Sequence, residues 1–261
     1  SRRWAIFGLT GVVGTFIVTR VIDLISFPLN YAIMFMVLSL GGFVSFYFSR
    51  KISLADQVPP PLPDAHSPLE NLRNYSRLLR EHPVFLSFAT KRFVYLSALV
   101  LSQPIMPLFL VREVRATDSQ IGTINMIFTL VMLVGYFLWP RVSSRQGGRF
   151  VLLATTLGMT FYPALSAATP QVPLILIYAG ISGLFQAGLD LVFFDELMKT
   201  VPSEYSATFV ALAQSMQYLS MIIAPLLGTW LANYIGLGGA LWLSAGLRLF
   251  GFLLFLRPDR K

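Results

Sequence analysis

Long apolar runs alternate with short polar segments along the chain. A helix needs about 20 apolar residues to cross the bilayer core, and eight runs approach or exceed this length. Segments with turn signals such as Gly147-Gly148 and Thr169-Pro170 separate the later runs. The pattern predicts an all-α polytopic membrane protein with about eight transmembrane helices. The expected spans are residues 4–25, 31–48, 84–111, 119–139, 149–167, 172–200, 206–234 and 238–256.

A polar segment of residues 51–82 separates the second span from the third. Its first half is rich in proline, and its second half begins with Ser67-Pro68-Leu69-Glu70, an order typical of a helix start. The apolar spacing that follows predicts a short amphipathic helix on the membrane surface, and a solvated connector helix is the alternative. The segment divides the chain into residues 1–50, with two spans, and residues 83–261, with six.

Composition agrees with a membrane protein. The chain of 261 residues is 55% hydrophobic, which is too apolar for a soluble domain of this length. Its net charge of +8 comes from basic residues placed singly or in pairs at the ends of apolar runs. This placement predicts contact with a lipid bilayer and no nucleic-acid partner. There is no cysteine, and both histidines lie in the polar segment, so we expect no metal site in the spans and no cofactor.

The basic residues predict the orientation. Only Arg112 and Arg115, with Arg20 near them, fall at one face of the eight-span arrangement. Cytoplasmic loops are enriched in lysine and arginine, so the termini and the linker are predicted to be cytoplasmic, in a bacterial inner (plasma) membrane. The residues at the cytoplasmic face are Arg2, Arg3, Arg50, Lys51, Arg73, Arg77, Arg80, Lys91, Arg92, Arg141, Arg145, Arg149, Lys199, Arg257, Arg260 and Lys261.

Asp190 is the only acidic residue in the middle of a long apolar run. Ser182 and Gln186 precede it at spacings of four, so the three side chains share one face of the predicted helix. A carboxylate inside a membrane is costly and is a functional candidate by default. However, Arg248 is expected at a similar depth, so an ion pair between these two residues is the competing structural interpretation.

Other polar side chains also occur inside the spans. Gln103, Asn125, Gln214 and Gln217 are candidates for facing a substrate cavity, and interhelical hydrogen bonds are the alternative. Small residues recur every four positions in the span at 206–234, which predicts a helix-packing face. They are Ser220, Ala224, Gly228, Ala232 and Gly236.

This order of spans resembles the last two-thirds of a major facilitator superfamily transporter, helices five to twelve. The stretches that carry the resemblance are residues 103–110 with 119–122, residues 201–204, and Ala224-Pro225-Leu226-Leu227-Gly228, which is similar to the family's Gly-Pro-x-x-Gly. The resemblance implies that residues 1–50 are the last two helices of a first bundle and residues 83–261 a complete second six-helix bundle. Helices one to four are then missing, and the start at Ser1 without methionine suggests a missing N-terminus.

A weak copy of the family's cytoplasmic signature, G-x-x-x-D-R-x-G-R-R, covers residues 140–149. Arg145, Gly147 and Arg149 match it, and Ser144 replaces the aspartate. Asp195 and Glu196 lie near the end of the span expected at 172–200, at the same predicted cytoplasmic face. The resemblance therefore implies a cytoplasmic gate, with an ion pair between one of these acids and Arg145 or Arg149.

The function implied by the resemblance is secondary active transport of a small-molecule substrate by alternating access. No nucleotide-binding motif occurs, and if protons drive transport, Asp190 is the best carrier. A transporter-like fold that serves as a membrane scaffold or assembly factor for a membrane protein partner is the alternative. An enzyme is not expected, because no HExxH motif and no paired carboxylates within the spans occur.

The topology can be tested with single cysteines, because the chain has none of its own. Ser53→Cys should react with an impermeant maleimide only from the cytoplasmic side, and Thr117→Cys only from the opposite side. The cysteine-free parent is the control. Labelling of both positions from the same side would contradict the eight-span arrangement.

Overall fold

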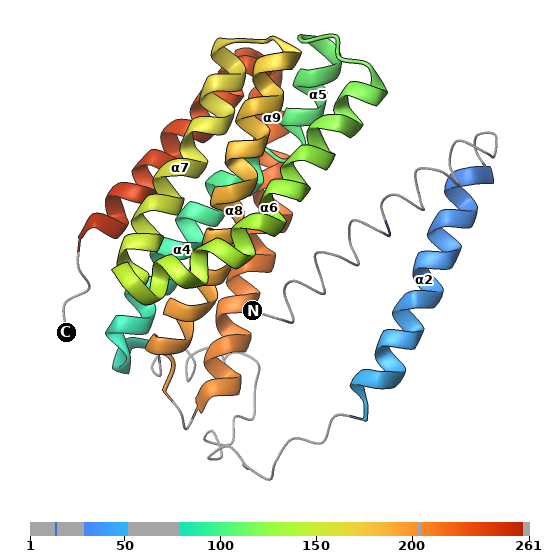
Figure 1. Cartoon of the computed structure of the whole chain (residues 1–261). Coiled ribbons are helices and arrows are strands. Elements are labelled where there is room, and N and C mark those ends of the chain that lie inside the picture. Colours follow the sequence, from blue (N-terminus) through green and yellow to red (C-terminus); the bar gives the residue numbers. More distant parts are fainter. Residues whose placement is uncertain (1–13, 15–28, 52–78, 203–204, 258–261) are drawn as a thin grey trace. The chain divides into compact units, whose positions relative to one another are not determined.

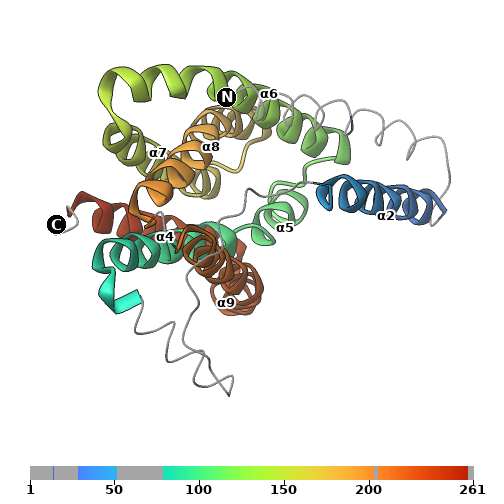
Figure 2. The ribbon, with the colours of Figure 1, turned by 90° about the horizontal axis from the view of Figure 1, so that it is seen from below.

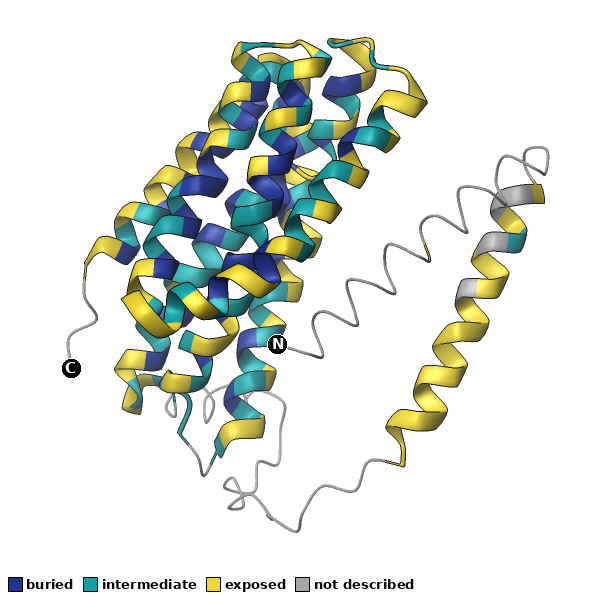
Figure 3. Ribbon diagram, viewed as in Figure 1, coloured by how far each residue is buried: buried dark blue, intermediate teal, exposed yellow. Residues whose placement is uncertain are grey.

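The computed structural model describes residue 14 and residues 29–51, 79–202 and 205–257. The chain divides into two units, Arg2–Pro59 and Pro60–Lys261. In the first unit, α2 (Leu29–Ser49) is an apolar helix of 21 residues with mostly exposed side chains (Figure 3). The helix expected at 31–48 is therefore confirmed. Apart from Gly14, the span expected at 4–25 lies outside the described residues, as do residues 52–78 of the linker.

The second unit is a bundle of six helical passes (Figure 1). Five of its segments are long and apolar enough to cross a membrane, and one of these, α9, has 51 residues and contains two passes. The two passes meet at Gly236, whose φ of 77° lies in the left-handed region. In order, the helices are α4 (Pro83–Leu101), α5 (Ile105–Arg112), α6 (Asp118–Gln146), α7 (Gly148–Ala168), α8 (Val172–Thr200) and α9 (Ser206–Leu256).

The expected all-α membrane fold is confirmed, and the described residues contain no strand. The span expected at 84–111 is nevertheless broken at Ser102–Pro104. Pro104 has no N–H to continue the α-helical ladder, and the N–H of Gln103 bonds to the carbonyl of Val100 (3.0 Å) instead of that of Leu99. The break leaves the Leu99 carbonyl without its helical donor and separates α4 from α5.

The helix α6 is longer than expected. It continues past Trp139 and through Pro140 to Gln146. An internal proline removes one ladder hydrogen bond, and transmembrane helices tolerate such a loss. Arg141 and Arg145 consequently lie on the last turns of a helix instead of in a loop. The chain then turns at Gly147, whose φ of 85° favours glycine.

The bundle packs around α8, which contacts α6, α7 and α4 (Figure 2). Small residues allow this approach: a Cβ placed at Gly183 would collide with the carbonyl of Phe128, and one at Gly135 would lie 2.7 Å from the Cβ of Ala187. Nearer the C-terminal end of α8, aromatic rings fill the core. Phe193 of α8 lies 5.8 Å from Tyr95 and 5.8 Å from Phe255, measured between ring centroids.

The packing face predicted at five small residues is confirmed at four of them and wrong at Gly236, which is exposed where the two passes of α9 meet. Ser220, Ala224, Gly228 and Ala232 are all buried. Gly228 lies against the backbone of Leu101 at the end of α4, where a Cβ would collide with the Leu101 carbonyl. The first pass of α9 therefore approaches α4 to backbone contact at the break between α4 and α5.

Gly228→Ala is expected to destabilise the bundle by about 1–3 kcal/mol, because the added methyl overpacks the contact with α4. The measurement is the apparent melting temperature in detergent. The control is Gly246→Ala on the same helix, where a Cβ meets nothing within 4 Å. This control should melt at the parent temperature or slightly above it, because alanine favours helix. Equal melting temperatures for Gly228→Ala and the parent would contradict the backbone contact.

Candidate functional site

The side chain of Asp190 is held by two neutral donors. The hydroxyl of Tyr136 on α6 donates to Oδ2 at 3.0 Å, and Nε2 of Gln186, one turn earlier on α8, donates to Oδ1 at 2.8 Å. Asp190 and Gln186 are both half-buried. Asp190 lies ten residues before the end of α8, which is about 15 Å of helix. The acid is thus deep in the bundle and bound to uncharged groups.

Two of the three residues of the polar stripe predicted on α8 contact each other. Gln186 and Asp190 come together, and Tyr136 of α6 joins them. Ser182 does not. It is 1% exposed and its hydroxyl lies 3.5 Å from the sulfur of Met159 on α7. Ser182 therefore packs inside the bundle and is separate from the carboxyl group.

Arg248, the competing partner of Asp190, has other contacts. It is 4% exposed, and its Nη1 donates to the carbonyl of Met159 at 2.7 Å. Its Nη2 donates to the hydroxyl of Ser102 at 2.5 Å and to the carbonyl of Leu99 at 3.4 Å. The described residues contain no ion pair between Arg248 and Asp190. The structural interpretation of an Asp190–Arg248 pair is therefore wrong.

The acceptors of Arg248 have a common origin. The carbonyl of Met159 lies four residues before Pro163, which is inside α7 and has no N–H to donate. The carbonyl of Leu99 loses its donor at the break before Pro104, where the Ser102 hydroxyl also donates to it at 3.0 Å. One guanidinium thus satisfies carbonyls that two proline-containing segments have left without helical partners.

A second polar contact involves Arg92, which the sequence had assigned only to the cytoplasmic face. Its Nη2 donates to Oε1 of Gln217 on α9 at 2.6 Å, and its Cζ lies 5.8 Å from the ring centroid of Phe193 on α8. Arg92 is half-buried and lies nine residues after Pro83, about 14 Å along α4. The neighbouring Lys91 donates to the carbonyl of Arg257 at 3.0 Å. Adjacent helical residues point about 100° apart, so the two basic side chains contact different neighbours.

The other candidates lie apart from these two contacts. Gln214 is half-buried, one turn before Gln217 on α9. Asn125 and Gln103 are exposed. Of the predicted set, the structure brings together Gln186 with Asp190 and places Gln217 on Arg92.

A hollow of about 400 Å³ lies between α6 and α8, away from both polar contacts. Its lining includes Ile127, Val131 and Leu184 and is wholly apolar. Such a surface suits lipid chains and offers no group for orienting a polar solute. In the described part of the chain, no three acidic or histidine side chains gather as they would around a metal ion.

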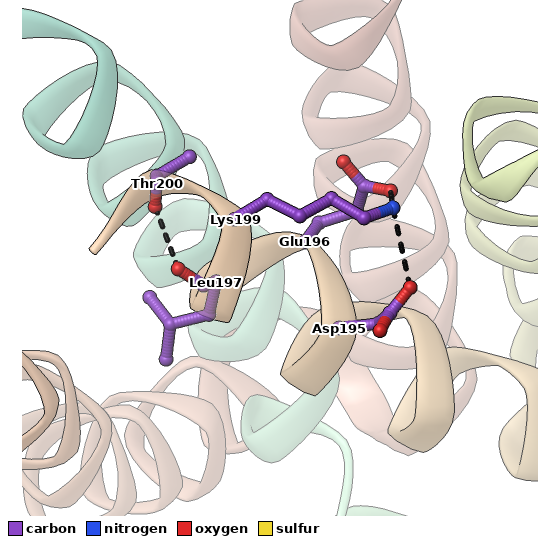
Figure 4. Close-up of polar contacts among 5 residues, drawn as sticks. All are labelled: Asp195, Glu196, Leu197, Lys199 and Thr200. Carbon is purple, nitrogen blue, oxygen red and sulfur yellow. Dashed lines mark hydrogen bonds and ion pairs between the residues drawn. The ribbon is translucent and has the colours of Figure 1, made fainter. Parts of the chain in front are cut away.

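At the C-terminal end of α8, Lys199 contacts both acids of the expected gate (Figure 4). Its Nζ lies 3.2 Å from Oδ2 of Asp195 and 2.7 Å from Oε1 of Glu196. Glu196 also lies against Gly148, the first residue of α7. Arg149 donates to the carbonyl of Leu256 at 3.1 Å. The expected pair with Arg145 or Arg149 is thus not formed among the described residues, because Lys199 on the same helix is the nearer cation.

The bundle of apolar helices is that of an integral membrane protein. The sequence profile of the Major Facilitator Superfamily matches residues 92–261, which is more than half of the chain. The chain belongs to this superfamily, whose members are transporters. No curated protein matches the sequence at a significant level.

The two partners of the rejected ion pair can be tested by a double-mutant cycle. Arg248→Gln should lower the free energy of unfolding in mixed micelles by about 1–3 kcal/mol, because glutamine cannot reach both carbonyls. Since Asp190 has separate contacts, adding Asp190→Asn should change stability by the sum of the single effects, within about 0.5 kcal/mol. Recovery of stability in the double variant would restore the ion-pair interpretation.

Proposed function

We propose that the chain takes part in proton-coupled secondary transport of a small solute by alternating access, with Asp190 as the proton carrier. The observation that supports this role is the set of partners of Asp190. Tyr136 and Gln186 are neutral, and the described residues place no cation within ion-pair distance of the carboxyl group. Asp190 can therefore gain or lose a proton without breaking a salt bridge.

The two partners suit both protonation states. When the carboxyl group is ionised, the Tyr136 hydroxyl and the Gln186 amide both donate to it, as in the structure. When it is protonated, its O–H can donate to the Tyr136 oxygen, because a phenol is both a donor and an acceptor. Gln186 can still donate to the other oxygen. The proton can thus be exchanged with small local movements, as a carrier in a cycle requires.

The gate is proposed on a different set of contacts. Lys199 forms ion pairs with Asp195 and Glu196 at the end of α8, and Glu196 lies against Gly148 at the start of α7. A partly exposed ion pair contributes about 0–1 kcal/mol, so a pair from one of these acids to another helix would bias one conformation without holding the fold. We propose that Asp195 or Glu196 exchanges Lys199 for Arg145 or Arg149 when the transporter changes conformation.

Proton coupling can be measured in proteoliposomes that contain a pH-sensitive dye. A panel of sugars, amino acids and organic acids is added from outside, and a coupled substrate acidifies the lumen as it enters. Asp190→Asn should abolish this acidification and leave exchange of the same solute across the membrane, because an amide cannot carry the proton. Exchange and coupling are thus separated in one preparation.

The matched control is Asp118→Asn. Asp118 is an exposed acid in the first turn of α6, so its replacement should leave acidification unchanged. Acidification that persists in Asp190→Asn would exclude Asp190 as the carrier. A folded protein that moves no solute of the panel but copurifies with a stable partner would favour the scaffold alternative.

A further inference from the structure

Arg92 is a cation inside the bundle whose charge is not matched. The ion pairs among the described residues involve Lys199, and none involves Arg92. Its partners are the neutral oxygen of Gln217 and the face of the Phe193 ring. Its Nε is buried and has no hydrogen-bond partner. A charged group in a membrane span is costly unless it is paired, and a buried N–H without an acceptor adds to that cost.

The geometry leaves part of the guanidinium free for a ligand. An arginine has five N–H donors in one plane, and the structure assigns one hydrogen bond of Arg92, from Nη2. Gln217 on α9 accepts the hydrogen bond from Nη2, and the Phe193 ring on α8 packs against the guanidinium. The side chain is thereby oriented in advance, and this reduces the entropy lost when it binds an anion.

We propose that Arg92, positioned by Gln217, binds the carboxylate of a small organic monoanion, and that this is the solute of the proposed transport function. A carboxylate matches the planar fork of a guanidinium and can accept two parallel hydrogen bonds from it. One guanidinium cancels one negative charge, whereas a phosphate dianion would leave an unmatched charge inside the membrane.

The proposal separates the tasks of the two polar contacts. Arg92 contacts α9 and α8, and the substrate anion would bind there. Asp190 contacts α6, and the proton would bind there. The charges of one carboxylate and one proton cancel, so their joint movement through the membrane transfers no net charge. This inference rests on the proposed transport function for its biological meaning, but the binding site itself is testable without transport.

The test is thermal stabilisation of the purified full chain in detergent by sodium benzoate. Benzamide has the same ring without the charge, and sodium chloride at equal ionic strength accounts for screening. Benzoate should raise the melting temperature by an amount that grows with the logarithm of its concentration, as a ligand of the folded state does. Benzamide and chloride should not.

The variants identify the site. Arg92→Gln should weaken benzoate binding about 10- to 100-fold, because a charge-assisted hydrogen bond is lost. Arg92→Lys should keep part of the affinity, since it keeps the charge but loses the planar fork. The control is Arg141→Gln, an exposed arginine that donates to Phe137 of its own helix, and it should bind as the parent does.

Gln217→Glu is a second variant that tests the same site if Arg92→Gln does not fold. It places a carboxylate next to the guanidinium, so the protein should melt higher without ligand and lose its response to benzoate. The proposal is overturned if benzoate does not stabilise the parent, or if it stabilises Arg92→Gln or Gln217→Glu as it does the parent. Binding of benzoate without any transport would refute the proposed function alone, and transport unaffected by Arg92→Gln would refute the binding site alone.

Discussion

The architecture of the bundle depends on the hydrogen bonds of one buried guanidinium. Prolines in the third and fifth expected spans leave the carbonyls of Leu99 and Met159 without helical donors, and an unsatisfied carbonyl in a membrane costs several kcal/mol. Arg248 donates to both and to Ser102. It therefore links the second pass of α9 to α4 and α7, and it allows α4 to end in a break where α9 approaches at Gly228.

Because Arg248 donates to these neutral acceptors, Asp190 has no cationic partner in the described part of the chain, and its carboxyl group is not part of a structural ion pair. The equal depth of the two residues made an ion pair reasonable, but depth alone does not specify direction around a helix. Because Arg248 points towards α4 and α7 while Asp190 points towards Tyr136 on α6, the two charges belong to different contacts. Asp190 is bound by groups that suit a proton carrier, and Arg92, like Arg248, has no acidic partner among the described residues.

Close helix packing positions both polar contacts. Gly183 and Gly135 let α6 and α8 approach, and this brings Tyr136 within hydrogen-bond distance of Asp190. One turn further along α8, Phe193 packs among the rings of Tyr95 and Phe255, and Arg92 lies over it. Small residues and aromatic rings thus place polar groups that could not reach each other between helices at ordinary separation.

The sequence by itself determined the all-α membrane class, the bounds of α8 and the division of α9 into two passes, because apolar length acts locally along the chain. It also identified Asp190 as an unusual intramembrane acid. Only the tertiary structure decided its partners, the break at Ser102–Pro104, the continuation of α6 through Pro140 and the inward direction of Arg92. The physical reason is that hydrogen bonds freed by proline, and the direction of a side chain around its helix, are resolved by neighbouring helices that one-dimensional periodicity does not specify.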